Sequence, residues 1–238
     1  MRQRPLYNGP MGQFNLIQLI IIWGPPVLFG ITLHEVAHGW VARRFGDPTA
    51  MMLGRLTVNP LKHIDIVGTI IVPVLLLVLH TGFIFGWAKP VPISPRNFKN
   101  PRRDMAVVAA AGPFSNLAMA VIWALISRVA ELLAPSLPWI VPLAYMGLAG
   151  VLLNVALFIF NLIPIPPLDG GRVLVGILPR NLANKVDSIE RYGSFIPLVV
   201  LMLVFYIFPG VLSMVLGPPV NWLSQLLLGG WFRLGCMT

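Results

Sequence analysis

Residues 34–38 of this chain read His-Glu-Val-Ala-His, which is a pattern suited to metal-dependent hydrolysis. On a helix, His34 and His38 share one face and can bind the same zinc ion, while Glu35 can accept a proton from a metal-bound water. In the apolar stretch Phe14–Val41, Glu35 is the only residue with a full charge. A carboxylate at mid-membrane costs roughly 2.5–3.5 kcal/mol on insertion scales, so such groups usually serve a function. We therefore predict a metal site here, and the competing interpretation is an ordinary pair of core histidines.

A third protein ligand is needed, because a catalytic zinc usually has three. The chain has eight acidic residues, and Glu35 is assigned as the base. Six others lie in expected loops or near the ends of apolar segments: Asp47, Asp65, Asp104, Glu131, Asp187 and Glu190. The remaining one, Asp169, follows three prolines that end an apolar segment, and broken membrane helices often aim polar groups into a cavity. We predict that Asp169 is the third ligand; alternatively, it only caps the helix that begins at Gly170.

The composition indicates an all-α polytopic membrane protein embedded in a lipid bilayer. Of the 238 residues, 57% are hydrophobic and only 11% are charged, whereas soluble domains carry about 25% charged residues. The net charge of +9 is explained by basic loops, so we predict no nucleic-acid partner. We expect one integral membrane domain over residues 1–238, with a first span that is retained rather than cleaved as a signal peptide. The sequence carries no signal for an oligomeric state.

Six apolar segments divide the chain: Phe14–Val41, Ile66–Leu79, Met105–Leu133, Ile140–Ile163, Gly193–Phe208 and Val211–Leu228. Ile66–Leu79 is too short for a span of about 20 residues and contains Pro73, so we predict that it is re-entrant. The flanking stretches Leu53–Pro60 and Trp87–Ile93 resemble short strands. The expected fold is therefore about five transmembrane helices plus a re-entrant segment with short membrane-associated β-strands.

The distribution of basic residues supports this topology. With a re-entrant segment and a hairpin of the last two apolar segments, fourteen of the 17 lysines and arginines fall on one face of the membrane, and only Arg2, Arg4 and Arg128 fall on the other. The positive-inside rule makes the basic face cytoplasmic. The same topology brings His34, His38 and Asp169 to one depth, nearer the cytoplasm.

Several motifs together resemble the site-2 protease family of intramembrane zinc metalloproteases. They are residues 34–39 (His-Glu-Val-Ala-His-Gly), 54–60 (Gly-Arg-Leu-Thr-Val-Asn-Pro), 86–92 (Gly-Trp-Ala-Lys-Pro-Val-Pro), Gly112-Pro113 with Asn116, and Asn161 with Asp169-Gly170. The resemblance covers roughly residues 31–176. The sequence contains no PDZ or CBS module, so it resembles the compact form of the family.

The resemblance implies a catalytic core over residues 14–176 that holds one Zn²⁺ per chain through His34, His38 and Asp169. Glu35 would activate a zinc-bound water to hydrolyse a peptide bond in or near the transmembrane segment of a membrane protein substrate. Asn161 would donate to the developing oxyanion or to the substrate backbone, and Asn116 could act similarly. The alternative for both asparagines is hydrogen bonding between packed helices.

Two other functions are alternatives to the protease. A non-catalytic membrane adaptor on the same scaffold would be expected to lose the base or a ligand, whereas all four residues are present. A metal transporter would need further ligands along a path through the bilayer. We expect the protein in a bacterial or archaeal cytoplasmic (inner) membrane, with residues 193–228 forming a C-terminal helical hairpin.

Overall fold

Residues 14–78, 86–190 and 209–229, together with residues 203 and 207, are described by the computed structural model. In this part of the chain the protein is mostly helical and contains no β-sheet. Among the described residues, three helices are long and apolar enough to cross a membrane: α1 (Leu16–Arg44), α4 (Pro101–Leu133) and α5 (Val141–Asn161), the last extended by a short 3₁₀ turn from Pro138. The expected membrane protein is thus confirmed. The count of five spans is not reached within the described residues.

The ends of α1 follow from its sequence. Asn15 accepts a hydrogen bond from the Gln18 backbone N–H, and the Gln18 side chain accepts one from the Asn15 N–H, which together satisfy two otherwise unpaired donors. At the other end, Arg43 and Arg44 lie in the last turn, where positive charges interact favourably with the helix dipole. Most of the residues between these ends are apolar, and α1 packs against both α4 and α5.

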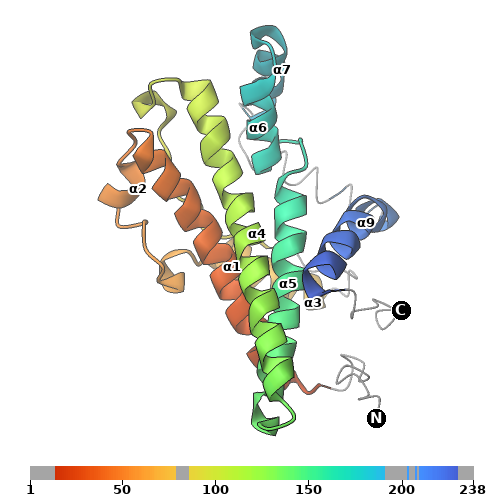
Figure 1. The fold of residues 1–238 in the computed structure, drawn as a ribbon. Coiled ribbons are helices and arrows are strands. Elements are labelled where there is room, and N and C mark those ends of the chain that lie inside the picture. The colour runs from red at the N-terminus through yellow and green to blue at the C-terminus, as the bar shows by residue number, and fades with distance from the viewer. Residues whose placement is uncertain (1–13, 79–85, 191–202, 204–206, 208, 230–238) are drawn as a thin grey trace.

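The three long helices form a bundle in which α4 contacts both α1 and α5. Figure 1 shows that α1 ends, α4 begins and α5 ends at the same end of this bundle. The residues that connect α1 to α4 therefore leave and return at one end, as a re-entrant segment requires. Between them lie α2 (Thr49–Met52), a 3₁₀ turn (Pro60–Lys62), a π-helical turn (Ile66–Ile71) that continues into α3 (Val72–Val78), and a second 3₁₀ turn (Pro95–Asn97).

The predicted strands do not form in the described residues, so that prediction was wrong. Residues 53–60 fold as turns and bends, and residues 86–94 are extended without a strand partner. Pro90 and Pro92 have no N–H to donate to a ladder. The Lys89 N–H instead donates to the His63 carbonyl at 2.9 Å, so the extended stretch is held by loops rather than by a neighbouring strand.

After α5 the chain turns into α6 (Asp169–Ile177) and α7 (Arg180–Glu190), which contact each other at the end of the bundle where α1 stops. α6 also packs against α4. The first half of the expected C-terminal hairpin, residues 193–208, lies almost wholly outside the described residues. Its second half is α9 (Pro209–Leu228), which packs on α5.

Candidate metal centre

The three predicted ligands meet where α1 approaches the start of α6. His34 Nε2 lies 3.1 Å from His38 Nε2 and 3.1 Å from Asp169 Oδ2, and His38 Nε2 lies 3.3 Å from the same oxygen. Ligand atoms about 2.0–2.1 Å from a tetrahedral zinc lie about 3.3 Å apart, so these separations match one face of such a tetrahedron. The donor set and its geometry therefore fit a zinc ion.

Both histidines are oriented by hydrogen bonds on their other ring nitrogen. His34 Nδ1 lies 2.6 Å from Asn116 Oδ1, and His38 Nδ1 lies 2.7 Å from the Val108 carbonyl. Each acceptor requires a proton on Nδ1, which leaves the Nε2 lone pair directed at the shared centre. Two lone pairs and a carboxylate oxygen converge there, an arrangement that a cation stabilises. The role of the Val108 carbonyl could not be predicted from the sequence, because every residue has a backbone carbonyl.

Asn116 belongs to a polar chain that crosses all three long helices. Its Nδ2 donates to the Gly30 carbonyl at 3.1 Å and to Asn154 Oδ1 at 3.0 Å, and Asn154 Nδ2 donates to the Gly150 carbonyl at 2.9 Å. Both asparagines are fully buried. Asn154 was missed in the sequence, although a lone amide in so apolar a segment is the same signal that identified Asn116. Because these bonds fix the amide of Asn116, its oxygen must face His34.

Asn116→Leu is expected to weaken zinc binding about 10–100-fold, because it removes the acceptor that orients His34. Asn116→Asp is the matched control, since a carboxylate still accepts from His34 Nδ1, and it should bind zinc more tightly than Asn116→Leu. Competition with a chromophoric chelator measures both affinities, after circular dichroism has established that each variant is folded. Equal losses in the two variants would contradict an orienting role for Asn116.

Gly112 provides the space in which the histidines meet. Val108, Gly112 and Asn116 recur every four residues, so they share the face of α4 that lies against α1. A Cβ atom on Gly112 would lie 2.3 Å from His38 Nε2 and 2.7 Å from His34 Cε1. In the sequence Gly112 is only part of a motif that resembles the family, and the structure shows that the two candidate ligand histidines pack against it.

Asp169 reaches this centre through a tight turn after α5. It is the first residue of α6 and is about nine-tenths buried. A Cβ atom on the following Gly170 would lie 2.4 Å from the carbonyl oxygens of Leu162 and Ile163, so only glycine lets the start of α6 pack so closely against the end of α5. The helix break predicted from the prolines therefore places the carboxylate against α1.

Glu35 lies beside the ligands but is not one of the three converging groups. Its Oε2 accepts a hydrogen bond of 2.8 Å from the Val91 N–H. Val91 lies between Pro90 and Pro92, so its N–H is the one backbone donor of that tripeptide. The role of Val91 was not predicted, because the stretch was interpreted as a strand.

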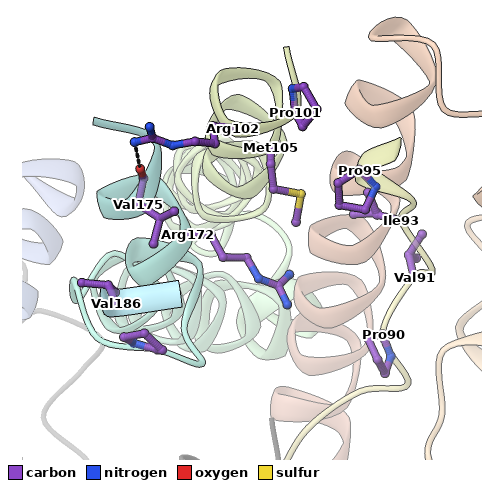
Figure 2. A pocket seen from close by; sticks show the side chains of 11 residues that line it. Pro90, Val91, Ile93, Pro95, Pro101, Arg102, Met105, Arg172, Val175 and Val186 are labelled. Carbon is purple, nitrogen blue, oxygen red and sulfur yellow. Dashed lines mark hydrogen bonds between the residues drawn. The ribbon is translucent and has the colours of Figure 1, made fainter. Parts of the chain in front are cut away.

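A cavity of about 440 Å³ adjoins this site on the side of α6 and α7. Its lining includes Val91, which contacts Glu35, and Pro166, which precedes Asp169. Figure 2 shows Arg172 reaching from α6 toward the centre of the cavity. Arg102 is held at its rim by hydrogen bonds to the carbonyls of Val175 and Leu178, at 2.8 and 2.6 Å. The remaining lining is largely apolar.

The two asparagines predicted to be catalytic differ in their surroundings. Asn116 is engaged by His34 and by the neighbouring helices, as described above. Asn161, the last residue of α5, is partly buried and donates from Nδ2 to the Leu157 carbonyl at 3.0 Å. Asn161 lies just before the turn that leads to Asp169. A role of Asn161 toward the substrate is therefore kept as a proposal.

Comparison with known proteins identifies the family. The model of peptidase family M50 matches residues 128–204, which include Asp169. A Bacillus subtilis protein named "Putative zinc metalloprotease YwhC" is 41% identical over 175 residues, which cover 73% of this chain and 76% of that protein. This chain belongs to peptidase family M50. The resemblance to site-2 proteases is thereby confirmed, and the protein is an enzyme of the zinc metalloprotease type.

More distant M50 relatives carry the same type of name. The Rip2 zinc metalloprotease homologue of Mycolicibacterium smegmatis is 31% identical over 176 residues, covering 74% of this chain and 64% of that protein. Rip2 of Mycobacterium tuberculosis strain H37Rv is 28% identical over 203 residues, covering 84% of this chain and 71% of that protein. No solved structure matches this chain.

Proposed function

We propose that this M50 peptidase is an intramembrane zinc metalloendopeptidase that hydrolyses a peptide bond in or near the transmembrane segment of a membrane protein substrate. The observation that carries this proposal is the triangle of His34 Nε2, His38 Nε2 and Asp169 Oδ2, with edges of 3.1–3.3 Å, beside the carboxylate of Glu35. His34, Glu35 and His38 lie on α1 of the apolar bundle, and Asp169 lies on α6, which packs against α4. One Zn²⁺ per chain would be held by the three ligands.

Zinc, when bound, supplies a Lewis acid that polarises the scissile carbonyl and makes a water acidic near neutral pH. Glu35 takes the proton from the attacking water as the oxygen forms its bond to the carbonyl carbon. It then returns the proton to the amide nitrogen as the C–N bond breaks. Asn161 is proposed to donate to the developing oxyanion. Asn116 is proposed to act indirectly, through its hydrogen bond to His34.

The cavity beside Val91 and Pro166 is the proposed route by which water and the substrate reach Glu35. A substrate helix must unwind before its carbonyls can react, and a cavity next to the ligands gives the unwound segment space. The bundle end with Arg43, Arg44, Arg102 and Arg172 is proposed to face the cytoplasm of a bacterial or archaeal cell, by the positive-inside rule. The active site would then lie nearer the cytoplasmic face of the inner membrane.

Elemental analysis of detergent-purified protein tests the ligand set. We expect about one zinc per chain in the wild type and, in Asp169→Ala, a loss of most of the metal, because two histidines alone leave the site one ligand short. Asp104→Ala is the control, since Asp104 is a buried aspartate that accepts from the Asn100 N–H and is not among the three converging groups. A well-folded wild type without zinc, or full zinc in Asp169→Ala, would contradict the proposed site.

A non-catalytic adaptor remains the second candidate within the same scaffold. To distinguish it, membranes from cells that carry the wild type or Glu35→Gln are compared by quantitative proteomics for fragments of single-span proteins. A peptidase predicts fragments only with the wild type, whereas an adaptor predicts identical fragment patterns in the two strains.

A further inference from the structure

Asp47 is a buried carboxylate that the proposed chemistry does not use. It follows the end of α1, and only 1% of its surface is exposed. Its Oδ1 accepts from the Thr49 N–H at 3.1 Å, from the Thr49 hydroxyl, and from Asn97 Nδ2 at 2.7 Å. Its Oδ2 accepts from the Ser94 N–H at 2.7 Å. Four donors on one buried carboxylate make it a firm anchor between α1 and the segment that precedes α4.

The charge state of Asp47 supports that function. Burial alone would raise its pKa, but the hydrogen bonds from Thr49, Ser94 and Asn97 outweigh burial, so the pKa lies below the usual value for aspartate. The residue is therefore a carboxylate at neutral pH, and its bonds to backbone N–H groups are charge-assisted.

The segment anchored by Asp47 also contacts Glu35. We call residues 87–94 the strap. Its first half is tied to the preceding loops by bonds from the Trp87 N–H to the Gly68 carbonyl (3.1 Å) and from Arg55 Nη2 to the Lys89 carbonyl (2.8 Å). At its far end, Ser94 is bound to Asp47. Between these points the Val91 N–H of the strap donates to Glu35 Oε2 of α1.

Packing places the strap against the same turn of α1. A Cβ atom on Gly39 would lie 3.0 Å from Val91 Cγ1, so Val91 rests on the backbone just after His38. Ile93 packs on a buried cluster formed by Ala42, Phe98 and Val108. Since the prolines on either side of Val91 limit its backbone freedom, a shift of the anchored end of the strap moves the Val91 N–H relative to Glu35.

We propose that Asp47 is a positioning residue for the peptidase reaction: it fixes the strap so that the Val91 N–H holds one oxygen of Glu35 and directs the other, Oε1, toward the attacking water. This inference rests on the proposed role of Glu35 as the base. In this role Asp47 affects the kcat of the reaction through Val91 and contacts neither the metal nor the substrate.

Asp47→Asn tests this inference by two independent readouts on the full-length zinc enzyme. Hydrogen exchange of peptides that contain Val91 should be about tenfold faster or more, because the anchor loses charge-assisted bonds. The kcat for a cleavable single-span reporter in proteoliposomes should fall about 10–100-fold, with KM and zinc content within about twofold of the wild type. Asp104→Asn is the matched control, and it should leave both Val91 exchange and kcat unchanged.

A second, milder variant tests whether an effect of Asp47→Asn is due to misfolding. Asn97→Ala removes one of the four donors to Asp47 and should shift both readouts in the same direction by a smaller factor. A slower kcat with unchanged Val91 exchange, or faster exchange with unchanged kcat, would overturn the proposal. If the wild type cleaves no reporter, the proposed function fails. The exchange experiment tests whether Asp47 fixes Val91 independently of any cleavage. Unchanged exchange in Asp47→Asn would show that Asp47 does not fix Val91.

Discussion

Glu35→Gln is expected to reduce peptide hydrolysis by about 10²–10⁴-fold while the protein keeps its zinc. Glutamine has nearly the shape of glutamate but cannot take a proton from water. Its side-chain oxygen can still accept from the Val91 N–H, so the strap should stay in place. The metal should stay too, because Glu35 is not among the three converging ligand groups. Single-turnover cleavage of a reporter in proteoliposomes measures the chemical step.

Glu131→Gln is the control for this experiment. Glu131 pairs with Arg128 at 3.3 Å near the end of α4, away from the metal centre, so its loss should leave cleavage within about twofold of the wild type. Cleavage by Glu35→Gln within a factor of about three of the wild type would mean that another group takes the proton.

Gly112→Ala is expected to weaken zinc binding by more than about 100-fold, although it adds a single methyl group. The added Cβ would lie 2.3 Å from His38 Nε2, which is a proposed ligand atom, so the histidine must move away from the centre. Loss of a group that orients a metal ligand already lowers metal affinity about 10–100-fold, and displacement of the ligand itself should lower it more. Zinc affinity by chelator competition, together with zinc per chain, measures the effect.

Gly147→Ala separates this effect from general crowding between helices. A Cβ atom at Gly147 would lie 2.7 Å from the Ser127 backbone nitrogen, so it also clashes between helices, but it does so between α4 and α5 with no metal ligand nearby. We expect it to lower stability and to leave zinc affinity unchanged. Similar losses of zinc in both variants would show that the role assigned to Gly112 is wrong.

The pair of histidines could be predicted from the sequence, because residue type and helical spacing suffice to place two imidazoles on one face of α1. Asp169 could be selected because few carboxylates occur in so apolar a chain and because prolines mark the helix break before it. The approximate ends of the long helices also follow from apolar length and, at the start of α1, from the capping residues Asn15 and Gln18. These signals are local or compositional, so a single sequence carries them.

Other features depend on tertiary contacts and could not be predicted in this way. Val91 touches Glu35 through a backbone N–H that residue identity does not specify. The stretch that forms most of the strap was mistaken for a short strand. The role of Gly112 depends on which helix faces it. Asn154 was the exception, because its position in an apolar helix was a readable signal that was missed.

The candidate ligands are far apart in the order of synthesis. From His38 to Asp169 the chain runs 131 positions (169 − 38). At about 5–20 residues per second, Asp169 is made roughly 7–26 s after His38. Throughout that interval the nascent chain presents two imidazoles and a glutamate without the carboxylate that completes the site. In the proposed mechanism, a newly inserted α1 would therefore be unable to cut the helices being inserted beside it until Asp169 has been translated.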